Sequence, residues 1–139
     1  MTSTSEIADT IRRHSDPRRE RFFVLPVADD GSFRMFQLAE GDGIHVPVDI
    51  PKVFRITKGC GCRRFIVAHN HPDSPFPIAS KADIRTSKKV YDMAKTLGME
   101  FVDHIIVTET RYMSFREDGI IAAYEPHREK RLNNLEIVD

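Results

Sequence analysis

Short apolar runs alternate with amphipathic stretches along this chain, a pattern that predicts strands interleaved with helices. The apolar runs predict strands at Phe22–Val27, Phe33–Ala39, Arg63–Ala68, Phe101–Thr108 and Tyr112–Phe115. Polar segments rich in turn-forming residues join the first strand to the second and the fourth to the fifth. These connections predict antiparallel hairpins at both ends of the set.

Helices are expected in the segments between these runs. Residues 3–13 carry isoleucines four apart on one helical face. A second helix is expected from Asp49, a candidate N-cap, to Gly59. The longest runs from Ser80 to Gly98, with one apolar stripe and a glycine where a C-cap belongs. Together the elements predict an α/β domain with a mixed sheet flanked by helices.

Composition sets the class of the protein. The 139 residues fit one domain, and 40% hydrophobic with 30% charged content is typical of a soluble globular protein. The sequence shows no apolar run near the ~20 residues that span a bilayer and no signal peptide, so we expect a cytoplasmic protein without a membrane partner. Lysine plus arginine equals aspartate plus glutamate at 21 each, so no global basic field favours nucleic acid.

The charge pattern also suggests where the domain begins and ends. We expect a core domain over residues 21–122, an N-terminal extension over 1–20 and a C-terminal tail over 123–139. Within the extension, Arg12–Arg21 is rich in arginine but interrupted by acidic residues and proline. A nucleic-acid-binding arm is one interpretation, and a solvated linker is the one we favour, because short charge runs usually are solvated.

Candidate chemistry is concentrated between Val67 and Asp83. Because side chains two apart on an extended segment point the same way, His69 and His71 can converge on one ion while Asn70 faces away. Asp83 suits a third ligand, since the positive end of the long helix favours its ionised form. Two imidazoles and one carboxylate around zinc leave a fourth position open, as in catalytic sites, where a bound water reaches a pKa of roughly 7.

Two other interpretations of these residues stay open. Ser80-x-x-Asp83 also fits a capping box, in which the two side chains only close the first turn of the helix. Cys60 and Cys62 form a Cys2His2 set with the two histidines, which predicts a structural zinc site. The Cys-x-Cys spacing is tighter than such sites usually have, so we favour thiols packed in a turn.

The central segment also resembles a known motif. His69-Asn70-His71-Pro72 followed by Ser80-x-x-Asp83 resembles the JAMM signature of the JAB/MPN metalloproteases, in particular their RadC-like branch. The segments 103–106 and 112–117 resemble that branch's strand pair after the helix, and the likeness covers roughly residues 21–121.

The resemblance implies a cytidine-deaminase-like α/β sandwich and a zinc ion (Zn²⁺) held by His69, His71 and Asp83. It also implies hydrolysis of a peptide or isopeptide bond, with Ser80 helping to stabilise the tetrahedral intermediate. Enzymes of this family carry a glutamate on an earlier strand that moves protons as the general acid/base.

The position of that glutamate departs from the family pattern. Counting back from the first histidine without gaps reaches Phe36 or Gln37, and neither side chain can act as a base. Glu40 is our candidate, because strand alternation places it on the face of Phe36 and Leu38. A shift in register or a bulge could bring it to the site. A solvated residue in the turn before Gly41 is the alternative.

We therefore expect a zinc-dependent metallopeptidase or isopeptidase with Glu40 and Ser80 as catalytic residues. The alternative is a non-catalytic JAB/MPN module that binds a protein or nucleic-acid partner, such as a RadC-like factor associated with DNA repair. The sequence indicates neither the substrate nor the oligomeric state.

Overall fold

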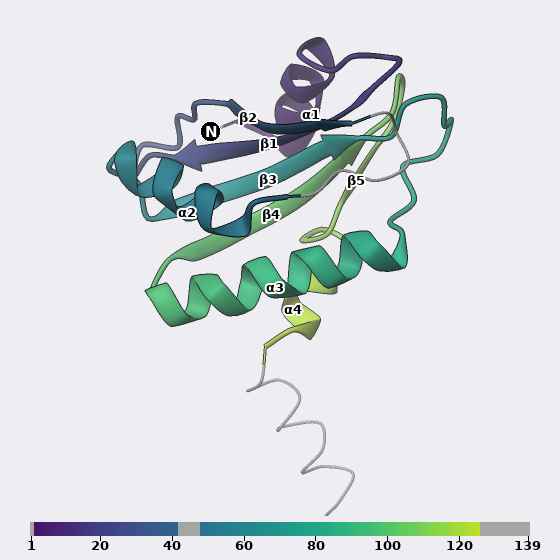
Figure 1. Cartoon of the computed structure of the whole chain (residues 1–139). Coiled ribbons are helices and arrows are strands. Elements are labelled where there is room, and N and C mark those ends of the chain that lie inside the picture. Colours follow the sequence, from purple (N-terminus) through teal and green to yellow (C-terminus); the bar gives the residue numbers. More distant parts are fainter. Residues whose placement is uncertain (1, 42–47, 126–139) are drawn as a thin grey trace, which may run out of the picture.

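A computed structural model describes residues 2–41 and 48–125, which form one mixed sheet with helices on both faces (Figure 1). The strand order is β2-β1-β3-β4-β5. The strands are β1 (Glu20–Val27), β2 (Phe36–Gly41), β3 (Arg64–Asn70), β4 (Glu100–Val107) and β5 (Tyr112–Ser114). The helices are α1 (Thr4–Arg13), α2 (Ile50–Gly59), α3 (Lys81–Leu97) and α4 (Ile120–Ala123). This confirms the predicted α/β class.

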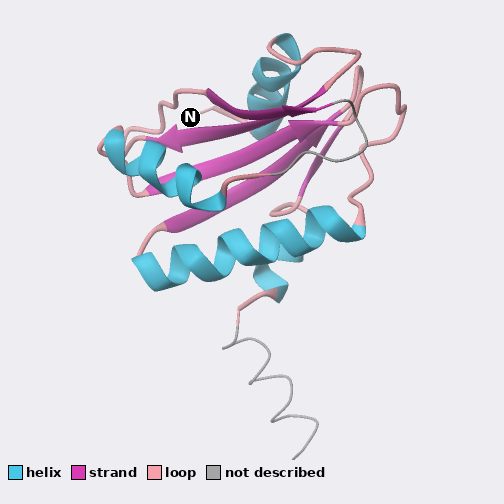
Figure 2. Cartoon of the chain, viewed as in Figure 1, coloured by secondary structure: helices cyan, strands magenta, loops and turns pink. Residues whose placement is uncertain are grey.

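The pairing of the strands follows from their connections. β3 and β4 are parallel, because α3 crosses over between them, whereas β1 pairs antiparallel with both β2 and β3. β5 returns antiparallel along β4, as the second predicted hairpin requires. The carboxyl ends of β3 and β4 therefore lie at the same edge of the sheet as the start of β1 (Figure 2).

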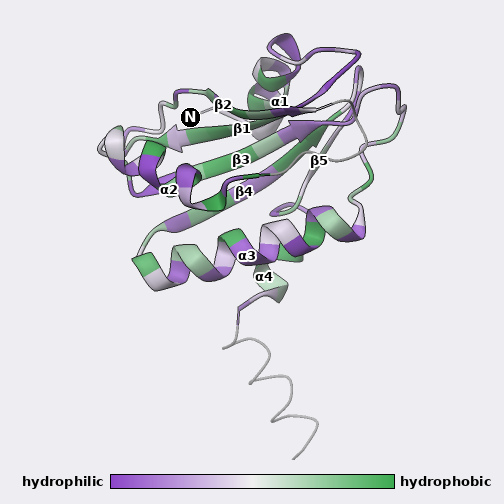
Figure 3. Cartoon of the chain, viewed as in Figure 1, coloured by the Kyte–Doolittle hydropathy of each residue, from purple (hydrophilic) through white to green (hydrophobic). Residues whose placement is uncertain are grey.

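Each face of the sheet has its own apolar cluster. One cluster joins β1, β3 and β4 to α2 and α3 and includes Phe65, Val67 and Val90. The other joins the opposite sides of the same strands to α1, through Ala8 and Ile11. The strands are correspondingly rich in hydrophobic residues, whereas hydrophobic and hydrophilic residues alternate along α3 (Figure 3).

A β-bulge interrupts the pairing of β1 with β2. Val24 pairs with Phe36 and Phe23 with Gln37, but the next pair is Phe22 with Ala39, so Leu38 is the extra residue. A bulge of this kind reverses the alternation of side chains along the strand that contains it. The residues of β2 after the bulge therefore face the opposite sides from those that alternation counted from Phe36 predicts.

The predicted helix ends are confirmed by hydrogen bonds. Asp49 caps α2 by accepting from the backbone N–H of Lys52, with proline in the first turn. Ser80 and Asp83 form a complete capping box at the start of α3. Gly98 ends that helix with φ of 68°, a left-handed conformation that glycine adopts without steric cost.

The two segments expected to lie outside the core domain, residues 1–20 and 123–139, both contain residues that pack against it. In the segment expected as an N-terminal extension, α1 buries Ala8 and Ile11 completely against the sheet and so contributes to the core. In the expected C-terminal tail, Tyr124 packs against the α3 side, while residues 126–139 lie outside the described part of the chain. Across residues 2–41 and 48–125, every helix is too short or too polar to cross a bilayer.

Candidate metal centre

The two histidines of the central segment lie at the carboxyl end of β3. His69 is the second-last residue of the strand and is buried, with 1% of its surface exposed. Its ring stacks on Phe22 of the neighbouring β1, at 5.2 Å between centroids and 9° between planes. This packing fixes one imidazole, and His71 follows one residue beyond the strand end with its ring on the same side.

Three side chains converge at this point. The Nε2 atoms of His69 and His71 lie 3.1 Å apart. The Asp83 carboxylate reaches both rings, with 3.3 Å from Oδ1 to His69 Nε2 and 3.2 Å from Oδ2 to His71 Nε2. Zinc–ligand bonds of roughly 2.0–2.1 Å in a tetrahedron place neighbouring ligand atoms about 3.3 Å apart. The three residues therefore already have the spacing and the donor types of a zinc site.

Asp83 serves the helix and the histidines together. Its Oδ2 accepts from the Ser80 backbone N–H at 2.9 Å, and its own N–H donates to Ser80 Oγ at 3.0 Å. Burial raises the pKa of Asp83, but hydrogen bonds from the two imidazoles outweigh it and hold the pKa far below its usual value. The capping interpretation is thus correct and does not compete with the metal interpretation, because one ionised carboxylate can cap the helix and still face both imidazoles.

A second carboxylate approaches from β1. Glu20, His69 and His71 present potential ligand atoms that all lie within 4.8 Å of one another. The pairing of β1 with β3 explains this, because Phe22 lies opposite His69 in an antiparallel ladder. Two residues further along each strand, the same register brings Glu20 opposite His71 and onto the same face as Phe22.

Glu40, our candidate from the sequence, lies elsewhere. It pairs with Arg21 of β1, and directly opposed residues share one face of a sheet. Arg21 alternates with Phe22, so Glu40 faces away from His69, and its carboxylate forms ion pairs with Arg19 at 2.7 Å and Arg21 at 3.6 Å. The β-bulge at Leu38 is the physical reason, because it reverses the alternation that we extrapolated from Phe36.

The alternative Cys2His2 site is excluded by the length of β3. Cys60 and Cys62 precede the strand, whereas the histidines stand at its far end. Seven residues of extended chain at about 3.3 Å each separate Cys62 from His69 by roughly 20 Å. The two thiols are free and partly buried in the turn between α2 and β3, as the packing interpretation predicts.

The arginine-rich segment before β1 is largely occupied by internal contacts. Arg12 donates to the backbone oxygens of Thr108 and Arg111 and pairs with Asp9 at 2.6 Å. Arg21 pairs with Asp16 and, like Arg19, with the carboxylate of β2 described above. These contacts hold Arg12, Arg19 and Arg21 within the fold.

A third histidine, His104, contacts the ring nitrogen of His69 that faces away from the candidate metal position. His104 of β4 is completely buried, and its Nε2 lies 3.0 Å from His69 Nδ1. Burial, and after it the neighbouring His69 ring, lowers the pKa of His104 well below its usual value, so the ring is neutral. If His69 coordinates a metal through Nε2, its Nδ1 carries the proton and donates to His104, as the outer partner of a histidine ligand usually accepts.

The backbone at His104 is itself held in place. Asp103 is buried and accepts from the backbone N–H of His104 at 2.7 Å and from Ser114 Oγ at 2.5 Å. It also accepts from the Arg116 N–H at 2.9 Å, which ties β4 to the segment after β5. The ring of His104 stacks on Phe115 at 4.3 Å, so both its position and its orientation are fixed.

Replacing His104 with phenylalanine is expected to lower zinc affinity about 10- to 100-fold, because the ring volume is kept while the acceptor for His69 Nδ1 is lost. A competition titration with a zinc chelator measures this. Ile105→Val, which shortens a buried side chain on the other face of β4, is the matched control and should leave affinity unchanged. Equal affinities for His104→Phe and the wild type would show that this hydrogen bond does not support the site.

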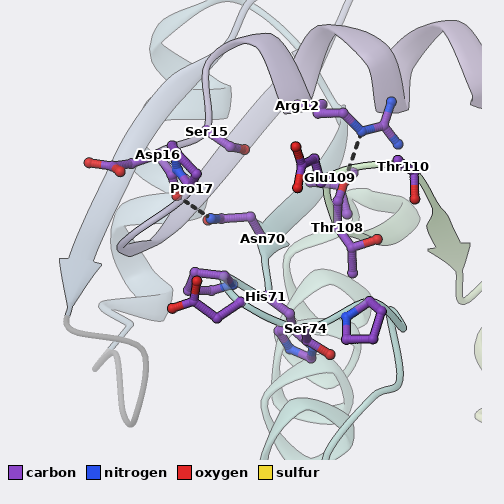
Figure 4. Close-up of a pocket in the computed structure, with 14 residues that line it drawn as sticks. Arg12, Ser15, Asp16, Pro17, Asn70, His71, Ser74, Thr108, Glu109 and Thr110 are labelled. Atoms are coloured by element: carbon purple, nitrogen blue, oxygen red, sulfur yellow. Dashed lines mark hydrogen bonds between the residues drawn. The ribbon is translucent and has the colours of Figure 1, made fainter.

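A cavity of about 560 Å³ adjoins the centre. It opens between the end of α1, the loop after His71 and the turn between β4 and β5, with Ser74 and Thr108 among its lining residues (Figure 4). Among the candidate metal ligands, His71 lines this cavity, beside Asn70. Ligand sites in proteins are typically cavities of this size beside a few polar groups.

Comparison with known proteins places this geometry in a family. Residues 1–120 match the RadC-like JAB domain. A UPF0758 protein of Syntrophomonas wolfei is 32% identical over 117 residues, covering 84% of this chain and 48% of the relative. A UPF0758 protein of Flavobacterium johnsoniae is 36% identical over 102 residues, covering 73% of this chain and 44% of the relative. The chain thus spans about half the length of these curated relatives. With its mixed sheet and its histidines at the end of β3, the chain belongs to the RadC-like JAB domain family.

Proposed function

We propose that this protein is a zinc-dependent hydrolase of the JAMM type that cleaves a peptide or isopeptide bond in the cytoplasm. The convergence of His69, His71 and Asp83, with ligand atoms 3.1 to 3.3 Å apart, is the observation that carries the proposal. A buried polar cluster of this spacing has the donor set of a catalytic zinc site, which keeps one position open.

His69, His71 and Asp83 would hold the metal. Zinc bound there supplies a Lewis acid and lowers the pKa of a coordinated water toward neutrality. The fold shields the site from solvent. His69 is buried, and the side chains of His71 and Asp83 are each less than a fifth exposed. Limited solvent strengthens electrostatic interactions within the site.

Glu20 replaces Glu40 as our candidate general base. Its position beside both imidazoles suits it to take a proton from the attacking water and to return it to the leaving amine nitrogen. Ser80 stays a candidate for stabilising the oxyanion. Its Oγ accepts from the Asp83 N–H, so its own hydroxyl hydrogen is available to donate.

The test is hydrolysis of a mixed panel of linear peptides and lysine-linked isopeptides by zinc-loaded protein, followed by mass spectrometry. We expect cleavage of at least one class, lost in Asp83→Asn. Asp92→Asn is the matched control, because Asp92 lies on the same helix and forms an ion pair with Lys88, one turn away. A wild-type protein that binds zinc stoichiometrically but cleaves nothing in the panel would favour the non-catalytic module.

A further inference from the structure

Asn70, between the two candidate ligands, has a side chain that the proposed chemistry does not use. It is 4% exposed and points to the α1 side of the sheet, opposite to His69. Its Oδ1 accepts from the Arg21 N–H at 2.7 Å, and its Nδ2 donates to the backbone oxygens of Asp16 and Arg19 at 3.0 Å each. Figure 4 shows the amide reaching the segment that precedes β1. All three contacts are to backbone groups.

These backbone groups bracket Glu20. The Arg19 carbonyl and the Arg21 N–H belong to the two peptide units that meet at the Glu20 Cα. The backbone pairs between β1 and β3 end at Phe22 with His69. Beyond that pair, the Asn70 side chain bridges β3 to the start of β1. On the β3 side, the Asn70 amide therefore links the backbone at Glu20 to the strand that carries the histidines, while on the other side Glu20 pairs with Gly41 of β2.

We propose that Asn70 is a positioning residue that holds the Glu20 carboxylate at working distance from His69 and His71. The inference rests on the proposed function, in which Glu20 is the general base. A base must lie within hydrogen-bonding reach of the proton that it removes, and a displacement of about 1 Å can lower a rate by about 100-fold. Asn70 would thus govern turnover without touching the metal or the substrate.

A purely structural Asn70 predicts different results. If its hydrogen bonds only stabilise the fold, substitution should lower stability while the folded fraction keeps its turnover, or should weaken zinc binding and turnover together. If it positions Glu20, turnover should fall while zinc affinity is kept, because the three proposed ligands are untouched. The loss should also disappear when Glu20 has already been removed.

Asn70→Asp is the sharpest variant, because it keeps the shape and the acceptor for the Arg21 N–H. It replaces the Nδ2 donor by an oxygen facing the carbonyls of Asp16 and Arg19. We expect kcat to fall about 10- to 100-fold, with zinc affinity within about threefold of wild type. In the Glu20→Gln background, adding Asn70→Asp should change kcat less than about twofold, since a double-mutant cycle reveals shared action.

Thr57→Val is the control for lost stability. Thr57 is completely buried in α2 and donates to the Val53 carbonyl at 2.8 Å, so its replacement also removes one buried hydrogen bond. It should lower the melting temperature and leave kcat unchanged. If Asn70→Asp slows the Glu20→Gln enzyme as much as it slows the wild type, or loses zinc in proportion to activity, the positioning role is overturned.

A readout without substrate separates this inference from the proposed function. In a crystal structure of Asn70→Ala, we expect the Glu20 carboxylate to move beyond the 4.8 Å that now joins it to the histidine nitrogens, while His69 and His71 stay in place. An unmoved Glu20 would overturn the inference. If the carboxylate moves but the wild-type protein hydrolyses nothing, the proposed function fails and the positioning of Glu20 by Asn70 stands.

Discussion

Replacing His71 with alanine is expected to abolish stoichiometric zinc binding. The change leaves two of the three converging side chains, His69 and Asp83, and removes the ligand that Asp83 Oδ2 now contacts at 3.2 Å. Because even outer partners of a ligand contribute about 10- to 100-fold in metal affinity, loss of a ligand should cost at least about 100-fold. Elemental analysis of the purified protein and a chelator competition titration measure the effect.

The control for this variant is another histidine. His14 is exposed at the end of α1, and its ring Nδ1 lies 2.9 Å from the Thr10 backbone oxygen of the same helix. His14→Ala should retain wild-type zinc content. Should His71→Ala retain as much zinc as His14→Ala, the metal centre assigned to the end of β3 would be wrong.

Replacing Glu20 with glutamine is expected to lower kcat about 100- to 10,000-fold, because the amide cannot accept and return a proton. Zinc affinity should stay close to wild type, since we assign Glu20 to proton transfer and not to the ligand set. Single-turnover hydrolysis of a substrate from the panel, compared with a zinc titration of the same sample, separates the two effects.

Glu40→Gln is the matched control, because it makes the same chemical change on the neighbouring strand. Glu40 is held by Arg19 and Arg21 on the opposite face, so its loss should cost only a weak, partly exposed ion-pair cluster. The two variants therefore compare both candidate bases directly. If Glu40→Gln is inactive and Glu20→Gln is not, our strand register is wrong.

The residues that converge at the end of β3 could be predicted from the sequence because each part of the cluster is local. The spacing of His69 and His71 requires only that the segment be extended, and β3 ends at Asn70, between them. Asp83 required only a helix start, which the Ser80-x-x-Asp83 pattern indicates by itself. The loop between the histidines and the helix start brings them together. The pattern of hydrophobic and polar residues does not predict the conformation of that loop.

Glu20 could not be predicted in the same way, because its position depends on the non-local pairing of β1 with β3. In the sequence it lies inside an arginine-rich segment that has the composition of a linker. One signal was present: Glu20 is an acidic residue two positions before Phe22, and so shares the face of an apolar strand residue. Alternation along β2 pointed to Glu40 instead, but the bulge at Leu38 reverses the alternation of side chains there.

The role of α1 shows a similar limit. Its helical character followed from the isoleucines four residues apart, and the structure adds a capping box between Ser3 and Glu6. Its packing against β3 and β4 could not be predicted from the sequence. An amphipathic stripe shows that a helix buries one face, but it does not show which part of the fold that face packs against. The strands have apolar residues on both sides, and this second apolar face is what α1 covers.

The most direct test of this account is a crystal structure of the zinc-loaded protein with anomalous diffraction at the zinc edge. We predict one peak at the end of β3, bonded to His69 Nε2, His71 Nε2 and a carboxylate oxygen of Asp83 at roughly 2.0–2.2 Å. The Glu20 carboxylate should lie beside the open position. Zinc bound through Cys60 and Cys62, or a zinc peak distant from both histidines, would contradict the account.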